Sequence, residues 1–468
     1  MSEPIWTWSA GRTAAAIREG AVSAEAVAEA HVARMRAASP AVNAVVRDLG
    51  EAAIETARSV DRDRARGAPL GPLAGTPVTV KENVDVAGLP NPNGVPAMAE
   101  LVAPEDAPVV RNLKAAGAVI LGLTNTPEFS MRAFTDNPLH GETLNPWDPE
   151  ATCGGSSGGA AAATALGIGC VGHGNDIGGS LRWPAHCTGL ATIRPTQGRV
   201  PAFNPSAPVE RSFTAQLMST QGPLAREVAD VRLALGAMAA RDPRDPLHVP
   251  APMAGPEAPK RALLARIPER LEAGPEAREA LRRAADRLSD AGWDVAEGAL
   301  PDLEGTWRLW GDLLFTEMDV MAGEGMLAVT TGDFAKVWGA YKAFSTRLDL
   351  KGFMAAQAER LTRIRAWSAL LEERPVILTP CCLSRTPPRG ADLAGDAAVR
   401  RLFANDLAFI SIFNLLGLPT AAAPVGLVDG LPVGVQLTAA RWREDVALDA
   451  AEAVEAGVVA EALGARTG

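Results

Sequence analysis

The residue types that could perform chemistry gather between residues 152 and 200, where two serines stand among glycines. Ser156 lies in the run GGSSGG and Ser180 lies in DIGGSLR, and the stretch 160–171 between them carries no charged side chain. Glycine has no Cβ, so the backbone N–H groups beside it can approach a ligand closely. A serine hydroxyl exposed next to such donors has what acyl transfer requires of a nucleophile. A flexible Gly/Ser linker would not be followed by an apolar, helix-forming run.

A nucleophilic serine needs a neighbour that takes its proton, and Lys81 is the candidate base. Only six of the 45 lysine and arginine residues are lysines, and Lys81 lies near the end of the β-branched run TPVTVKENV, residues 76–84. Unlike arginine, a lysine can lose its proton when it is buried without a carboxylate partner. Position alone leaves a solvated lysine at the end of a strand equally open.

Other catalytic designs fit the sequence less well. The residues around Ser156 match GxSxG, the nucleophile turn of α/β-hydrolases, but that fold needs a histidine late in the chain and none follows His248. Neither glycine cluster precedes Gly-Lys-Ser/Thr, so we expect no phosphate-binding loop. Because no His, Cys, Asp or Glu grouping has metal-ligand spacing, we expect neither a metal nor a cofactor. The adjacent Cys381 and Cys382 are interpreted as structural thiols.

The elements that position these residues alternate between strand and helix. Ser23 is expected to cap an early helix, a strand covers residues 76–84, a helix covers 106–116 and a buried strand follows at 118–121. Strand, helix and strand in succession indicate a layered α/β structure. Further on we expect a helix that starts near residue 159 or 160 with Ser156 as its N-cap, a helix at 275–291, strands at 293–296 and 376–380, a mostly helical stretch at 303–373, and two strands within 414–435 around an Asp429-Gly430 turn.

Composition narrows the class of protein. A net charge of −10 without a run of five like charges argues against a nucleic-acid-binding surface. The first residues lack the charged start and apolar core of a secretion signal, and the apolar stretch 402–428 is interrupted by Asn405 and Asp406, so no membrane partner is expected. Five cysteines, an odd number, suggest no disulfide framework and predict a cytoplasmic location.

Several motifs together resemble those of the amidase signature family. They are GGSSGG, DIGGSLRWPA, the GRVP that ends at Pro201, and TPVTVKENVDVAG around Lys81. The similarity extends from SAEAVAEAHVARM near the start to GLPVGVQL near the end, so it covers nearly the whole length. The resemblance implies one α/β domain over 1–468, with a central mixed sheet of about a dozen strands covered by helices on both faces. Its expected parts are a helical N-terminal segment 1–66, a catalytic core 67–225, a helix-rich insertion at about 265–373, and C-terminal core strands and helices 374–468.

The same resemblance implies roles for individual residues. Ser180 would be the nucleophile, Ser156 the bridging serine after a cis peptide bond at Gly155, and Lys81 the base. Asp176 and Arg182 are expected to brace the loop, and Ser157 to secure the turn. The oxyanion hole would be built from the backbone amides of Ile177, Gly178, Gly179 and Ser180, and the candidate substrate-binding walls are Phe129, Met131, Phe134, Trp183 and Cys381. The sequence departs from the family pattern at Cys153, Leu123 and Arg194, where proline, lysine and lysine are common, and these changes bear on substrate preference.

The resemblance therefore predicts an amidase that cleaves carboxylic amides through an acyl-enzyme. The charge-poor loops favour a small, neutral aryl or aliphatic amide as the partner molecule, and carbamates (a urethanase activity) or esters could react at the same site. One alternative is the glutamine-hydrolysing A subunit of a tRNA-dependent amidotransferase, which would need partner subunits. Another is a non-catalytic binding scaffold, against which the intact Lys81, Ser156 and Ser180 argue. A homodimer is an open alternative for the assembly.

Overall fold

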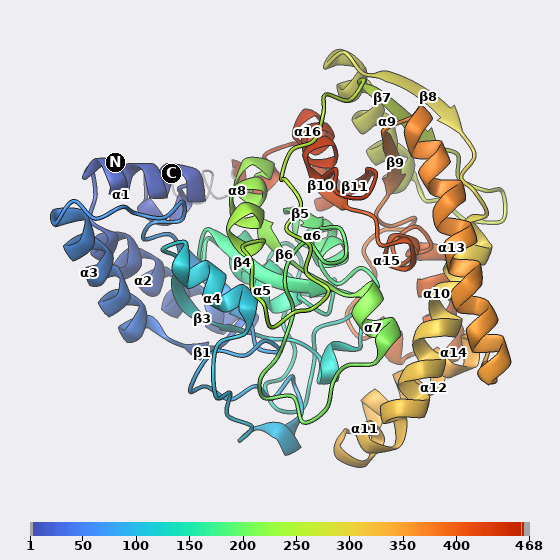
Figure 1. Ribbon diagram of the computed structural model, residues 1–468, viewed down its shortest axis with the longest axis horizontal. Coiled ribbons are helices and arrows are strands. Elements are labelled where there is room, and N and C mark those ends of the chain that lie inside the picture. Colours follow the sequence, from blue (N-terminus) through green and yellow to red (C-terminus); the bar gives the residue numbers. More distant parts are fainter. Residues whose placement is uncertain (1–2, 460, 463–468) are drawn as a thin grey trace.

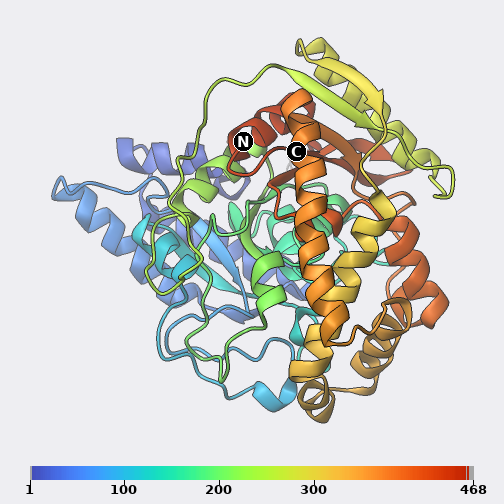
Figure 2. The same ribbon diagram turned by 45° about the vertical axis from the view of Figure 1, so that its right-hand side comes forward.

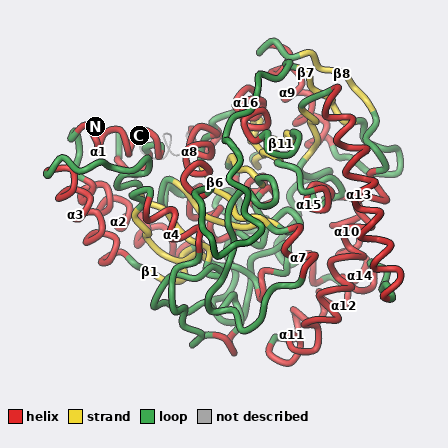
Figure 3. Tube along the Cα trace, in the orientation of Figure 1, coloured by secondary structure: helices red, strands yellow, loops and turns green. Residues whose placement is uncertain are grey.

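All strands in the part of the chain that the structure describes belong to one sheet. The computed structural model describes residues 3–459, 461 and 462. In Figure 3 the strands run as one twisted band through the middle of the molecule, with helices on both sides. The strands are β1 (Val45–Asp48), β2 (Pro77–Lys81), β3 (Val119–Thr124), β4 (Val171–Asp176), β5 (Ala191–Arg194), β6 (Thr220–Ala225), β7 (Arg261–Ala265), β8 (Asp294–Gly298), β9 (Val376–Pro380), β10 (Thr420–Val428) and β11 (Leu431–Thr438).

The sheet has 11 strands in the order β1-β3-β2-β4-β6-β5-β10-β11-β9-β7-β8, with parallel and antiparallel pairs. This arrangement confirms the predicted single α/β domain with a mixed sheet of about a dozen strands. Both faces of the sheet are buried. Along β3, Ile120 packs into one hydrophobic cluster, whereas its neighbours Val119 and Leu121 pack into another, because successive side chains of a strand point to opposite faces.

Helices form a layer on each face (Figure 1). The helix predicted at 275–291 shows why they do so: Ala277, Leu281, Ala284 and Leu288 recur at helical spacing and are buried against the sheet. The first layer holds α4 (Pro108–Ala115), α8 (Val228–Met238), α9 (Pro275–Asp290) and α16 (Glu444–Val454), and the second holds α2 (Ala24–Val42), α3 (Gly50–Ala65), α5 (Gly158–Ala165) and α6 (Arg182–Thr188), with α1 (Ala10–Glu19) beside α8.

The stretch 303–373 is mostly helical, as predicted, and forms a lobe at one end of the sheet (Figures 1 and 2). Its helices share a second large hydrophobic cluster with Ile377 of β9 and with residues of α15 (Ile412–Leu416). The lobe and its neighbours comprise α7 (Phe213–Met218), α10 (Leu303–Met318), α11 (Glu324–Val329), α12 (Gly332–Phe344), α13 (Leu350–Glu373), α14 (Asp396–Arg401), α15 (Ile412–Leu416), and π-helical turns at Asp319–Gly323 and Leu402–Asp406.

Several sequence predictions need correction at their edges, among them the strand predicted at 76–84, which ends at Lys81. Residues 414–416, predicted within a strand, lie in α15, which ends where Gly417 adopts a left-handed conformation. The two strands around the Asp429-Gly430 turn are present, and the second continues beyond residue 435 to Thr438. The predicted helix at 106–116 begins only at Pro108, because a proline is well placed at the first helical position.

The sheet brings the chemically interesting residues to one edge. β2 and β4 are parallel neighbours, with Thr79 opposite Gly172, so their carboxyl ends lie side by side. Lys81 ends β2, Asp176 ends β4, and the two serines of GGSSGG lie just before α5. Ligands of α/β sheets commonly bind beyond the carboxyl ends of such strands. Among the residues that the structure describes, no helix is long and apolar enough to cross a membrane.

Candidate active site

The side chain of Lys81 is fully buried, so it is not a solvated lysine at a strand end. Its Nζ lies 2.7 Å from Ser156 Oγ, 2.9 Å from Asn175 Oδ1 and 3.2 Å from Ser157 Oγ. No carboxylate of the described chain forms a salt bridge with Lys81. Burial lowers the pKa of Lys81 well below its usual value, although the charges of Asp176 and Glu82 oppose this shift. The amine therefore has the environment of a base.

Ser156 lies in a tight turn between the cavity and α5. The peptide bond from Gly155 to Ser156 is cis. The residue before α5 is Ser157, and its side chain makes no capping hydrogen bond, so the prediction of Ser156 as N-cap is wrong. The hydroxyl of Ser156 is turned instead toward Lys81. Gly155 borders the cavity, and a Cβ at this position would lie 2.6 Å from the backbone nitrogen of Phe134.

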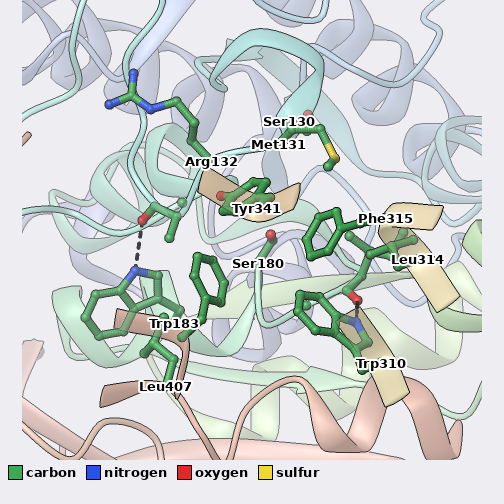
Figure 4. Close-up of a pocket in the computed structure, with 15 residues that line it drawn as sticks. Ser130, Met131, Arg132, Ser180, Trp183, Trp310, Leu314, Phe315, Tyr341 and Leu407 are labelled. Carbon is green, nitrogen blue, oxygen red and sulfur yellow. Dashed lines mark hydrogen bonds between the residues drawn. The ribbon is translucent and has the colours of Figure 1, made fainter. Parts of the chain in front are cut away.

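Ser180 faces the cavity, and its hydroxyl makes no hydrogen bond to any described residue. Figure 4 shows this hydroxyl at the centre of the aromatic side chains that surround the cavity. No hydrogen bond joins Ser180 to Ser156 in the described chain. The hydrogen bond that Ser156 Oγ makes within the described residues is the one with Lys81 Nζ.

The loop before Ser180 offers free backbone donors to the cavity. The N–H groups of Ile177, Gly178 and Ser180 make no hydrogen bond within the described chain, and all three residues border the cavity. The N–H of Gly179 differs, because it donates to Asp176 Oδ1 at 2.7 Å. Of the four backbone amides expected in an oxyanion hole, three therefore have no internal partner in the described chain, and that of Gly179 has one.

A buried ion pair holds this loop in place. Arg182 donates from Nε and Nη2 to the two carboxylate oxygens of Asp176 at 3.0 and 3.1 Å, and both side chains are fully buried. Burial alone would raise the pKa of Asp176, but the adjacent Arg182 guanidinium keeps that pKa below its usual range. Arg182 also donates to Asn414 Oδ1 and Gln436 Oε1, each at 2.7 Å. These bonds fulfil the bracing function expected of Asp176 and Arg182.

Gly179 is required by the shape of the loop. Its φ of +114° is a conformation that side chains disfavour. A Cβ at this position would lie 2.0 Å from Ile410 Cγ2. Any larger residue would therefore displace the loop that carries Ser180.

The walls of the cavity are mostly aromatic (Figure 4). Phe315 contacts Trp310 and Tyr341, with ring centroids 5.5 and 5.0 Å apart. The indole N–H of Trp310 donates to the carbonyl oxygen of Ile177 at 3.0 Å, which ties the wall to the loop before Ser180. The cavity is lined by Ser130, Met131, Arg132, Ala133, Gly155, Ile177, Gly178, Ser180, Trp183, Trp310, Leu314, Phe315, Tyr341, Phe403 and Leu407.

The structure places the predicted wall residues in different surroundings. Met131 and Trp183 line the cavity. Phe129 lies outside the lining and packs edge-on against Phe334, with ring centroids 5.8 Å apart. Phe134 and Cys381 are also outside the lining, and both are buried in the core. Sequence neighbours of the site are therefore a poor guide to its walls.

Sequence reasoning missed the walls that come from the distant lobe. Trp310 and Leu314 are four residues apart on α10, so they share one side of the helix, and Phe315 follows directly. Tyr341, on α12, is the only tyrosine of the chain. Helical spacing indicates that such a face is buried, but it does not say against what.

The lining of the cavity is almost free of charged side chains. Of the described residues that line it, Arg132 alone carries a charged side chain. This guanidinium is nearly fully buried and donates from Nε and Nη2 to the two oxygens of Asp392 at 2.8 and 2.9 Å. In the described part of the chain, no three His, Cys, Asp or Glu side chains are arranged to hold a metal ion.

Comparisons with known proteins agree on one family. The family model described as Amidase matches residues 26–448. The chain is 56% identical over 464 residues to an indoleacetamide hydrolase of Bradyrhizobium diazoefficiens, covering 98% of this chain and 88% of that protein. It is 34% identical to the A subunit of the glutamyl-tRNA(Gln) amidotransferase of Moorella thermoacetica, covering 93% of each chain. The solved structure of 6-aminohexanoate cyclic dimer hydrolase is 28% identical, covers 97% of both chains and has a TM-score of 0.80.

The match spans the sheet, both helix layers and the lobe, and the resemblance seen in the sequence motifs is confirmed. The expected enzyme class is confirmed as well, because the similar proteins include named amide hydrolases. The chain belongs to the amidase signature family and is an amide hydrolase.

Proposed function

We propose that this amidase hydrolyses small neutral amides with an aromatic acyl group, of the indole-3-acetamide type, through an acyl-enzyme on Ser180. The observation that carries the mechanism is the contact of 2.7 Å between Lys81 Nζ and Ser156 Oγ at a buried site without a carboxylate partner in the described chain. Burial without such a partner favours the neutral form of a lysine, and a neutral amine accepts a proton. Ser180 supplies the unengaged hydroxyl in the same site.

In the first half of the reaction Ser180 Oγ attacks the carbonyl carbon of the amide. Its proton passes to Ser156 Oγ while the proton of Ser156 passes to the Nζ of Lys81. The oxyanion that forms is stabilised by the N–H groups of Ile177, Gly178 and Ser180, and each such donor contributes about 2.7–4 kcal/mol in comparable sites. The carbon–nitrogen bond then breaks as the proton returns from Lys81 through Ser156 to the leaving nitrogen.

In the second half water takes the place of the leaving amine. The same base removes a proton from water, the resulting hydroxide attacks the ester carbonyl of acylated Ser180, and the tetrahedral intermediate forms again. Its collapse releases the carboxylic acid and restores the Ser180 hydroxyl. For a primary amide the two products are ammonia and a carboxylic acid.

The cavity supports an aromatic, uncharged acyl group. Its wall combines the rings of Trp183, Trp310, Phe315, Tyr341 and Phe403, and aromatic walls favour flat apolar ligands. Its one cation, Arg132, is already paired with Asp392. A substrate with a charged group would find no free counter-ion among the described residues of this lining. The indoleacetamide hydrolase that is 56% identical to the chain carries a name consistent with such a substrate.

Tyr341 supplies a polar group within the apolar wall. Its hydroxyl makes no hydrogen bond to any residue in the described ranges. Burial raises the pKa of Tyr341 above its usual value, so the phenol stays protonated and can donate or accept. We assign it the N–H of an indole ring as partner. Carbamates and esters with a similar aromatic group would react at the same serine, since each presents a carbonyl and a leaving heteroatom.

A second candidate is the glutamine-hydrolysing component of a tRNA-dependent amidotransferase. It is favoured by the 34% identity to the A subunit of the glutamyl-tRNA(Gln) amidotransferase of Moorella thermoacetica. Glutamine carries an ammonium and a carboxylate, which both require charged partners, and the lining of the cavity offers only the engaged Arg132. The neutral cavity therefore favours the arylacetamide hydrolase.

The test is a hydrolysis panel run on the wild type and on Ser180→Ala. Indole-3-acetamide, phenylacetamide, hexanamide, L-glutamine, an aryl carbamate and an aryl ester are compared by kcat/KM. We expect the highest value for the arylacetamides and loss of every activity in the variant. Preferential hydrolysis of L-glutamine would favour the amidotransferase component, and full activity of Ser180→Ala would overturn the acyl-enzyme.

A further inference from the structure

We infer that Asn175 is a positioning residue that aims the lone pair of neutral Lys81 at Ser156. The inference deepens the proposed function, because it rests on Lys81 being the base. Asn175 lies near the end of β4 and approaches Lys81 with Oδ1, at 2.9 Å from Nζ. The sequence motifs predict a role for Asp176 but none for its neighbour Asn175.

Counting hydrogens shows why the partner matters. A neutral lysine amine has two N–H bonds and one lone pair, and Lys81 has three oxygen partners. Asn175 Oδ1 is a carbonyl oxygen and can only accept, so it receives one N–H. The hydroxyl of Ser157 donates to the main-chain oxygen of Asn175 at 3.3 Å, so Ser157 Oγ can accept the second N–H of Lys81. The lone pair is then left for the hydroxyl hydrogen of Ser156.

The hydrogen bond that Asn175 Nδ2 donates sets the orientation of the side-chain amide. Asn175 Nδ2 donates to Asn83 Oδ1 at 2.9 Å, and Asn83 Nδ2 donates to Ser130 Oγ at 2.9 Å. Ser130 in turn donates to Asn93 Oδ1 at 2.7 Å. In each hydrogen bond of this series the donor is the group nearer to Lys81 and the acceptor is the group farther from it. A flipped Asn175 would place an N–H against Lys81 and an oxygen against Asn83 Oδ1, which would break two bonds at once.

The chain also joins the base to the wall of the cavity. Ser130 lines the cavity and has a φ of +58°, which is uncommon for a residue with a side chain. Its hydroxyl accepts from Asn83 and donates to Asn93, so both of these bonds hold the wall in this conformation. Asn175 therefore couples the orientation of the catalytic amine to the segment that contacts the substrate.

Asn175→Asp separates positioning from a merely structural role. The substitution keeps the shape of the side chain and places a carboxylate against Lys81, and an opposite charge at this range raises a lysine pKa by about 1–3 units. We expect the acidic limb of the pH profile of kcat/KM for indole-3-acetamide to move up by at least about one unit. A structural role would lower kcat/KM equally at every pH and would leave the limb in place.

Two further variants complete the test. Asn93→Asp is the matched control, because it puts the same charge at the far end of this series of hydrogen bonds and still accepts from Ser130. The acidic limb of its pH profile should stay at the wild-type position. Asn175→Ala removes the acceptor without adding charge and should lower kcat without moving the limb upward. Thermal unfolding checks that each variant is folded. If Asn175→Asp does not fold, the kcat of Asn175→Ala tests the positioning role.

The outcomes distinguish this inference from the proposed function. An unmoved limb in folded Asn175→Asp, or wild-type kcat in folded Asn175→Ala, overturns the positioning role while Lys81→Ala remains inactive. Full activity of Lys81→Ala would instead remove the base itself, and the proposed mechanism with it.

Discussion

Asn175 and Asp176 are consecutive in β4, yet the first contacts Lys81 and the second is paired with Arg182. Successive side chains of a strand point to opposite faces, so the neutral amide meets the lysine and the carboxylate is directed elsewhere. The carboxylate of Asp176 is thereby neutralised by an arginine. This arrangement lets Lys81 remain buried with a lowered pKa instead of forming an ion pair.

Replacing Arg182 should destabilise the protein. Arg182→Met leaves Asp176 buried and unpaired, and removing one partner of a buried ion pair costs about 3–5 kcal/mol in the free energy of unfolding. Denaturant unfolding monitored by tryptophan fluorescence measures the loss. Arg282→Met is the control, because Arg282 is exposed on the surface of α9 and its partners Glu279 and Asp286 are partly and fully exposed, so its unfolding midpoint should match the wild type. Equal midpoints for both variants would contradict the bracing role.

Arginine should fail as a substitute for Lys81. Arg has a side chain of similar length, but it stays positively charged because it cannot give up its proton in a protein. We expect Lys81→Arg to lower kcat for indole-3-acetamide by at least about 10²-fold, the lower range for loss of a general base. The control is Lys114→Arg, at an exposed lysine paired with Asp106, which should keep the wild-type kcat. Appreciable turnover by Lys81→Arg would argue that the residue acts only through its charge.

A methyl group at Gly179 should disturb the oxyanion-binding loop. The added Cβ of Gly179→Ala meets Ile410 at 2.0 Å, and the backbone conformation is unfavourable as well. We expect kcat to fall by about 10²-fold, as when one oxyanion donor is lost. Gly236→Ala, within α8 and facing open space, should leave kcat unchanged and raise the free energy of unfolding by about 0.5–1 kcal/mol. A Gly179→Ala enzyme with wild-type kcat would show that the loop tolerates the displacement.

The hydroxyl of Tyr341 should contribute to recognition of the indole ring. Tyr341→Phe keeps the aromatic wall, and loss of one neutral hydrogen bond corresponds to about 1 kcal/mol, or roughly fivefold in kcat/KM for indole-3-acetamide. The 1-methyl derivative of this amide lacks the N–H, so the variant and the wild type should hydrolyse it at similar rates. A fivefold loss on both amides would mean that the hydroxyl supports the wall and does not bind the substrate N–H.

The three residues of the proposed triad could be selected from the sequence alone. GGSSGG and DIGGSLR mark the serines by their glycines, and Lys81 is conspicuous as a lysine in an apolar strand of a chain that mostly uses arginine. The helical lobe could be predicted from the residue pattern, and the mixed sheet could be predicted from the family resemblance.

The rest depends on packing that sequence patterns do not encode. Asn175 meets Lys81 only because β4 pairs in parallel with β2 in one particular register. Tyr341 and Trp310 line the same cavity as Ser180 because the lobe packs over the site, although its residues lie more than a hundred positions further along the sequence. Phe134 and Cys381 are predicted as walls of the cavity, but both are buried in the core and lie outside the lining.

The most direct test of the central claim is the reaction of Ser180 with a fluorophosphonate, followed as a second-order rate constant across pH. In the wild type the rate should rise with pH through one ionisation well below the usual lysine pKa of about 10.4, because only neutral Lys81 accepts the proton. In Lys81→Ala that ionisation should vanish and the rate should fall by at least about 10²-fold. A Lys81→Ala enzyme that is labelled at the wild-type rate, with the same pH profile, would contradict the account.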